Sequence, residues 1–204
     1  MKTQRMFDKV AEHLLNQNER CGDDVEGTCF YRMRTQDHRN LKCAVGAIIP
    51  DERYEPKYEM NGVVGLSITF PESLSDSLSQ VGSVFWLAQM PVLISLQQLH
   101  DNLEPAKWAV GLSYIAECYH LEYDGPEWTG QLSELEMEIL APENARRRLR
   151  EEIFGAKYQL EHAGRAAHEQ GRTLRENPYA KDSELAQHWE QGWKDADVKE
   201  YVNV

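Results

Sequence analysis

Glycine and tryptophan recur at helical spacing near the C-terminus, and this pattern constrains the fold more than any other stretch. Two indoles and two small residues share one face of a predicted helix: Trp189, Gly192, Trp193 and Ala196. Upstream, a stripe with almost no side chain recurs at i, i+3 and i+7: Gly164, Ala167 and Gly171. A helix with such a stripe can approach another helix closely, and the indoles can cover it. The pattern therefore predicts two helices packed on each other.

The segment between these two helices is predicted to turn at Asn177-Pro178-Tyr179. Proline fixes its own φ, supplies no amide donor and biases the preceding residue away from the helical region. Asp182 or Ser183 then fits the N-cap of the last helix, because short polar side chains accept hydrogen bonds from free amides.

This combination resembles the ribosome modulation factor family, short bacterial proteins made of two helices around such a turn. The residues that carry the resemblance are Gly164, Gly171, Arg172, Pro178, Tyr179, Trp189, Gly192, Trp193 and Ala196. The resemblance implies a ribosome-binding activity that silences translation. It covers the C-terminal part of the chain alone.

Charge separates this chain from that basic family. The formal net charge is −12, and residues 155–204 hold seven Lys and Arg against nine Asp and Glu. Proteins that bind phosphates gain affinity by releasing counterions, so binding to rRNA needs at least a local cluster of cations. The candidates are Arg165, Arg172, Arg175, Lys181 and Lys194, joined by Arg146, Arg147 and Arg150 of an arginine run.

Alternatives exist for several of these residues. The arginine run precedes Glu151 and Glu152, so it also fits a solvated helix face with internal ion pairs. Trp189 and Trp193 fit stacking on bases, but their spacing beside small residues favours a core position. Tyr179, held at the turn, is the aromatic residue expected to be exposed and to contact a base.

The N-terminal part mixes helix and strand signals. An amphipathic helix is predicted over Thr3–Asn18, and two β-prone runs around a polar loop, Thr28–Arg34 and Leu41–Val45, predict a hairpin. Ala44–Ile49 fits a strand or a buried helix, and Val63–Phe70 predicts a further strand.

Several segments of this part resemble a recurrent family of small bacteriophage and prophage proteins. They are FDKVAEHL, CFYRMR, LKCAVGAIIPDERY and LQQLHDN, and the resemblance extends from Met1 to about Leu121. It implies a phage origin and carries no known function.

Two groups of side chains invite a metal. Cys29, His38 and Cys43 bracket the predicted hairpin and could reach one zinc ion; without a CxxC pair, buried free cysteines are the alternative. His100-Asp101 suggests a metal-dependent phosphohydrolase, or else a pair that bonds locally at a helix end. No GxGxxG, Walker loop, GxSxG or HExxH motif occurs. We expect the protein to bind no metal and no cofactor, and not to be an enzyme.

The predicted fold is α+β and mostly helical. Residues 1–125 form a helical domain with a small antiparallel hairpin or sheet, residues 126–154 a helical linker, and residues 155–204 the two-helix module. No run of eighteen apolar residues and no signal peptide occur, so we expect a cytoplasmic protein of a bacterial host cell that binds no membrane.

Three functions remain open. The first is a phage-encoded, non-enzymatic protein whose C-terminal module binds the ribosome or RNA and modulates host translation. The second is an acidic inhibitor of a host defence protein, since a net charge of −12 suits a basic partner site. The third is an enzyme that modifies a small molecule. The sequence does not determine the oligomeric state.

Overall fold

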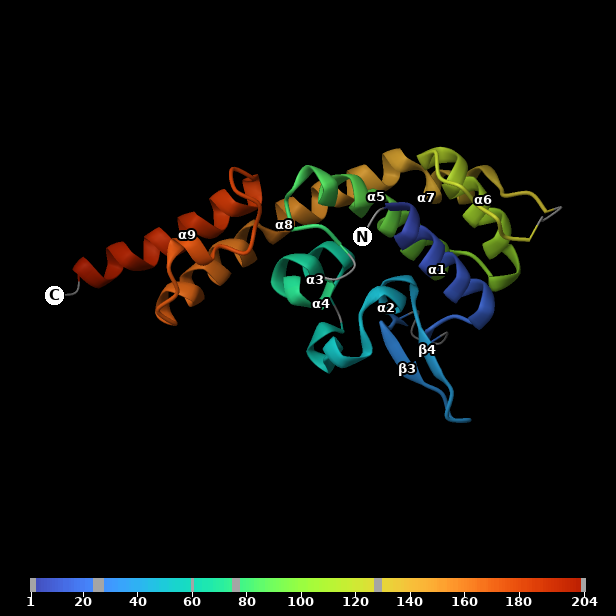
Figure 1. Cartoon of the computed structure of the whole chain (residues 1–204), viewed down its shortest axis with the longest axis horizontal. Helices are drawn as coiled ribbons and strands as arrows, with labels where there is room; N and C mark the ends of the chain where they lie inside the picture. Colours follow the sequence, from blue (N-terminus) through green and yellow to red (C-terminus); the bar gives the residue numbers. More distant parts are fainter. Residues whose placement is uncertain (1–2, 24–27, 60, 75–77, 127–129, 203–204) are drawn as a thin grey trace.

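The computed structural model describes residues 3–23, 28–59, 61–74, 78–126 and 130–202. The molecule is elongated, with the C-terminal helices at one end (Figure 1). Among the described residues helices dominate, and two antiparallel pairs of short strands accompany them. The expected α+β, mostly helical class is confirmed. Within the described part of the chain, no helix is both long and apolar enough to cross a membrane.

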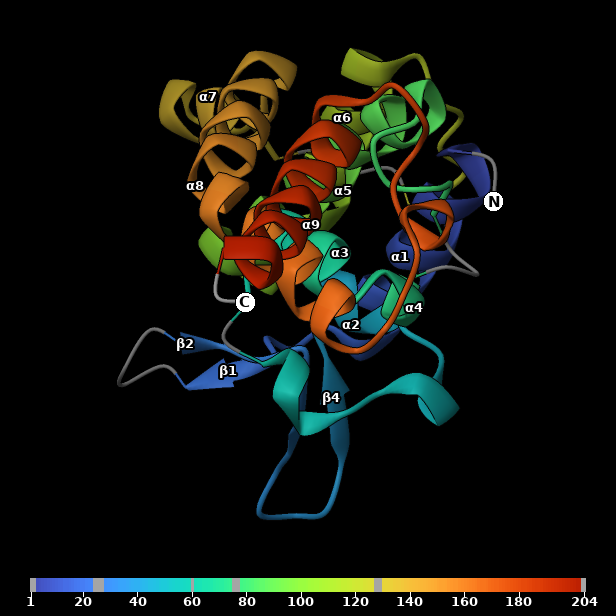
Figure 2. The same cartoon turned by 90° about the vertical axis from the view of Figure 1, so that its left-hand side faces the viewer.

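The chain begins with the amphipathic helix α1 (Thr3–Gln17), as predicted. Two short strand pairs follow it: β1 (Gly22–Asp23) with β2 (Thr28–Cys29), and β3 (Arg32–Arg34) with β4 (Asn40–Lys42). The second pair confirms the predicted hairpin, with strands shorter than the β-prone runs. It projects from the body of the molecule (Figure 2).

Two apolar segments of this part are helical. Ala44–Ile48 forms the buried helix α2, which settles the open choice between strand and helix. The strand predicted over Val63–Phe70 is wrong, because Val63–Thr69 forms helix α3, followed by α4 (Pro71–Leu74). A buried strand there would need partner strands for its amides and carbonyls, whereas a helix pairs them internally. Two 3-10 turns, Asp51–Arg53 and Pro56–Tyr58, link α2 to α3.

Three helices complete the N-terminal part. Helix α5 (Val84–Asn102) is its centre, and the side chain of Ser83 caps it by accepting from the amide of Trp86 at 3.2 Å. After a 3-10 turn (Pro105–Lys107) come α6 (Trp108–Tyr119) and α7 (Glu134–Leu140).

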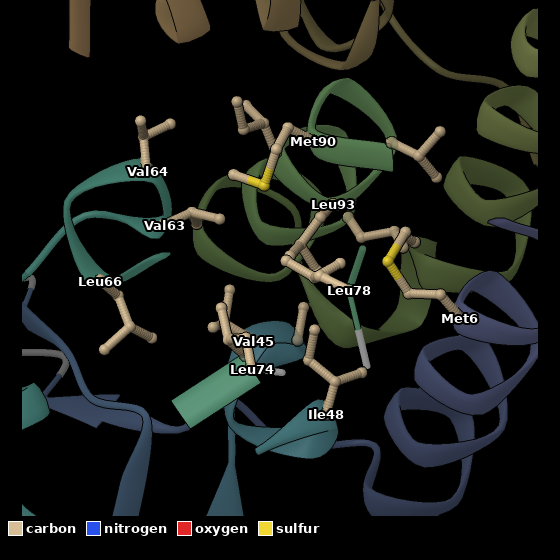
Figure 3. Close-up of a cluster of buried hydrophobic side chains, with 14 of the residues drawn as sticks. Met6, Val45, Ile48, Val63, Val64, Leu66, Leu74, Leu78, Met90 and Leu93 are labelled. Carbon is tan, nitrogen blue, oxygen red and sulfur yellow. The ribbon is translucent and has the colours of Figure 1, made fainter. Parts of the chain in front are cut away.

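The core is one continuous apolar cluster around α5. Side chains from α1, α2, α3 and α4 point into the same space as Met90 and Leu93 of α5 (Figure 3). The cluster extends through helix α8 (Pro142–Glu169) to Leu185 and Trp189 of the last helix. The C-terminal helices are therefore packed onto the same core as the rest of the chain.

Helix α8 (Pro142–Glu169) joins the two parts. It packs on α3, on α5 and on the last helix. It runs without interruption through Gly155, where the sequence places the change from linker to module. The other boundary, after residue 125, borders residues 127–129, which lie outside the described residues. The division into three parts stays a prediction.

Helix α9 (Glu184–Val202) runs in the same direction as α8, which Figure 1 shows. The residue numbers of contacting pairs increase together along both helices. Nδ1 of His188 lies 3.6 Å from the Glu161 carboxylate, and the ring centres of Trp193 and His168 are 4.6 Å apart. Residues 170–183, here named the return segment, therefore travel back along α8 before α9 begins. They include the 3-10 turn Leu174–Glu176.

Two glycines allow the backbones of α8 and α9 to touch. A Cβ on Gly164 would overlap the carbonyl of Trp189, and a Cβ on Gly192 would overlap the carbonyl of Glu161. Ala167, the next position of the predicted small stripe, is also buried. The predicted packing of two helices through small residues is therefore found.

Gly171 differs from the prediction, because it does not belong to the packed stripe. It has φ +73°, and nothing lies within 4 Å of a Cβ built on it. Its amide donates to His168 at 2.8 Å, and the amide of Arg172 donates to Ala167 at 2.9 Å. This is the Schellman arrangement that ends a helix, and it favours glycine at the left-handed position.

Gly192→Ala is expected to lower the free energy of unfolding by about 1–3 kcal/mol or more, since the added methyl forces two helix backbones apart. Gly155→Ala is the matched control, because it lies on the same helix pair with nothing within 4 Å of its Cβ. That variant should be more stable by about 0.5–1 kcal/mol. Urea unfolding followed by circular dichroism measures both, and equal stability of the two variants would contradict the glycine contact.

Candidate nucleic-acid interface

The return segment is anchored to the N-terminal part by Tyr179. Its hydroxyl donates to the carbonyl of Ile68 in α3, and the side chain is 3% exposed. Next to it, the amide of Ala180 donates to Val81 at 2.8 Å. The expectation that Tyr179 is exposed is therefore wrong. Its ring is covered because the return segment runs back over α3 and cannot offer that ring to a base.

The two tryptophans belong to the helix contact. Trp189 is 3% exposed and part of the core, and Trp193 is partly buried against it. The indole of Trp193 donates to the carbonyl of Arg172 at 2.8 Å, which holds the start of the return segment on α9. The core interpretation of these indoles agrees with this packing. Ser183, one of the two proposed N-caps, accepts from the amide of Ala186 at 3.1 Å.

The return segment presents three cations to solvent. Arg172, Arg175 and Lys181 are exposed, and none of them forms an ion pair with another described residue. Two acids lie in the same segment, and one of them, Glu176, closes a capping box by accepting from the amide of Thr173 at 2.7 Å. The segment thus carries a local excess of positive charge on an acidic protein.

The other two candidate cations of the module are either paired with an acid or partly buried. Lys194 lies 3.3 Å from Glu190, one helical turn away. Arg165 is half-buried, and its Nε is buried with no hydrogen-bond partner among the described residues. Neither offers the open positive charge that the return segment does.

Two arginines of the run at the start of α8 are paired within their own helix. Arg147 lies 3.0 Å from Glu151 and donates to Asn144 at 2.7 Å, and Arg146 lies 3.9 Å from Glu143. Arg150 is exposed and has no ion pair to a described residue. The structure therefore separates Arg150 from Arg146 and Arg147, which the sequence treats alike.

The residues proposed for metal binding lie in different groups from those expected from the sequence. His38 lies exposed at the tip of the β3–β4 turn with φ 67°, away from Cys43, which is buried and caps α2. The zinc site hypothesised from Cys29, His38 and Cys43 is therefore not assembled. Instead Cys29 meets His100 and Asp101, with the thiol 3.6 Å from His100 Nδ1.

The hydrogen bonds of His100 decide whether this cluster suits a metal. The amide of Cys21 donates to Nε2 at 2.9 Å, so that nitrogen offers its lone pair. The ring proton then lies on Nδ1, which donates to Asp101 at 2.9 Å. A zinc ion on Nδ1 would displace this proton and leave the ring with none. The cluster therefore fits a polar network inside the core better than a zinc site.

The Cys29 thiol is likewise held in its neutral form. Contact with Cys43 and burial raise its pKa far above the ordinary value for cysteine. The side-chain amide of Gln97 donates to the sulfur at 3.2 Å and to Asp101 at 2.7 Å. A nucleophilic cysteine needs a lowered pKa and a base with a free nitrogen. This network supplies neither to Cys29.

The C-terminal part is thus a pair of helices that touch at two glycines, with a cationic segment between them. Residues 157–201 match the family model of the ribosome modulation factor. No curated protein and no solved structure matches the chain. The C-terminal resemblance is thereby confirmed, whereas the resemblance of the N-terminal part to a phage family stays a prediction.

Tyr179→Phe is expected to lower the free energy of unfolding by about 1 kcal/mol or more, because the carbonyl of Ile68 then loses its buried donor. Tyr58→Phe is the matched control, since the hydroxyl of that buried tyrosine has only a 3.4 Å contact with Glu55. Thermal melts compare the two. A Tyr179 variant as stable as the Tyr58 variant would contradict the anchoring role.

Cys29 is expected to react slowly with iodoacetamide in the native protein, because its raised pKa leaves little thiolate. Labelling in denaturant, where that environment is lost, should restore the rate of an ordinary cysteine. Mass spectrometry of peptides after timed labelling measures both. Rapid native labelling of Cys29 would show an activated thiolate and would support the enzyme hypothesis.

Proposed function

We propose that the α8–α9 pair binds the ribosome and that the protein acts on translation without being an enzyme. The observation that carries this proposal is the family match over residues 157–201, on a helix pair that exposes unpaired cations. We further propose that the helix pair contacts the phosphates of rRNA. We also propose that the protein is encoded by a phage and modulates translation in its host.

The arrangement of charge supports this contact despite the acidic composition. Counterion release depends on the cations that face the phosphates, and a few local cations suffice for each contact. Arg172 and Arg175 lie at the start of the return segment and Lys181 near its end. The binding residues we propose are therefore Arg172, Arg175 and Lys181, without Tyr179.

The second candidate function is an acidic inhibitor that binds a basic site on a host protein. It is favoured by residues 1–154, which hold 15 Lys and Arg against 25 Asp and Glu. A nuclease-treated pulldown from a bacterial lysate separates the candidates. Ribosomal proteins and rRNA fragments support the first candidate, and one host protein without them supports the second.

Arg172→Ala with Arg175→Ala is expected to weaken co-sedimentation with ribosomal subunits by about tenfold and to reduce the salt slope by about 2. Arg146→Ala with Arg147→Ala removes the same charge from the internally paired run and serves as the control. It should leave both quantities nearly unchanged. Equal loss in both variants would indicate non-specific attraction, and no loss in either would overturn the assigned contact.

A further inference from the structure

Two large aromatic side chains stand in solvent on α8. Phe154 and Tyr158 are each 75% exposed and lie one helical turn apart. The buried face of the helix is formed by other residues, among them Leu149, Ala156 and Leu160. The two rings therefore contribute little to the core, and their exposure marks a surface that contacts something else.

Cations flank these rings on the same side of the helix. Arg150 precedes Phe154 by four residues, and Lys157 follows it by three, so both neighbour the ring on the helix surface. Both are exposed and form no ion pair with a described residue. The nearest acids on this side, Glu151 and Glu161, lie 3.0 Å from Arg147 and 3.6 Å from His188.

A groove opens beside Tyr158. It encloses about 510 Å³ between α8 and α3, and Phe70, His162 and Lys57 line it together with Tyr158. The ammonium of Lys57 lies 5.4 Å from the centre of the Phe70 ring. The groove is large enough for one planar aromatic group. The cation at its wall, Lys57, also lies 3.0 Å from Glu55.

We propose that this face of α8 binds single-stranded RNA. Phe154 and Tyr158 stack on unpaired bases, Arg150 and Lys157 meet the neighbouring phosphates, and the groove beside Tyr158 receives one base. Interleaved aromatics and cations suit a strand whose bases are free, because every base has a face to stack and every linkage has a charge.

This inference deepens the proposed function, since it names unpaired RNA as what the module contacts on a ribosome. It also assigns a role to Phe154 and Arg150, which precede the family match at residues 157–201. The contact is separate from the return segment, so each can be removed without the other.

The test is the binding of a fluorescein-labelled single-stranded RNA of about 12 nucleotides, within the usual range of site sizes, by fluorescence anisotropy. The same RNA annealed to its complement is the second probe. The full-length protein should bind the single strand at least tenfold more tightly than the duplex. Phe154→Ala with Tyr158→Ala should weaken single-strand binding by tenfold or more.

Two further variants make the result decisive. Phe85→Ala removes an aromatic ring that is 71% exposed on α5 and should change nothing. Phe154→Trp with Tyr158→Trp keeps stacking rings and should retain binding, which excludes a folding defect as the cause. Equal affinity for single strand and duplex, or equal loss with Phe85→Ala, overturns the proposal.

The outcome is distinguishable from that of the proposed function. Failure of the wild-type protein to co-sediment with ribosomal subunits while it still binds the single strand would reject the ribosome and keep the RNA face. Co-sedimentation that persists in the Phe154 and Tyr158 double variant, with no single-strand binding in the wild type, would reject the RNA face and keep the ribosome.

Discussion

The close approach of α8 and α9 at Gly164 and Gly192 is the contact on which the C-terminal part depends. Backbone atoms of each helix occupy the space where a Cβ of the other would lie. Because both helices run in the same direction, the chain between them must travel back along α8. That return brings Tyr179 against α3 and leaves Arg172 and Arg175 in solvent. The glycine contact thus leads both to the burial of Tyr179 and to the exposure of the two arginines.

Helix α8 packs on both the N-terminal part and the last helix and so connects them. Its inner face packs on α3 and α5 and continues into the contact with α9. Glu152, on its inner side, accepts from the amide of Val64 at 3.2 Å, and burial raises the pKa of this carboxyl group. With the inner face committed to packing, the exposed side of the helix is available for binding. Phe154 lies on that side, and Tyr158 lies beside the groove between α8 and α3. A continuous helix fixes their position relative to the return segment.

The network of Cys29, His100 and Asp101 shows why proximity of reactive residues is insufficient evidence for chemistry. Each group already has a partner: His100 accepts from Cys21, and Asp101 accepts from His100 and Gln97. A nucleophilic cysteine needs a lowered pKa, and a histidine ligand needs a free ring nitrogen; Cys29 and His100 supply neither. Their evident effect is to satisfy polar atoms at the junction of β2 and α5.

The sequence by itself determined the local features of this protein: the small stripe and indoles of the helix pair, the first helix, the hairpin and the helical class. These follow from spacing and from residue type, which act within a few turns of chain. Tertiary structure decided the burial of Tyr179, the helical state of Val63–Thr69 and the meeting of Cys29 with His100. Each depends on which distant segments come together, and periodicity along the chain carries no information about that.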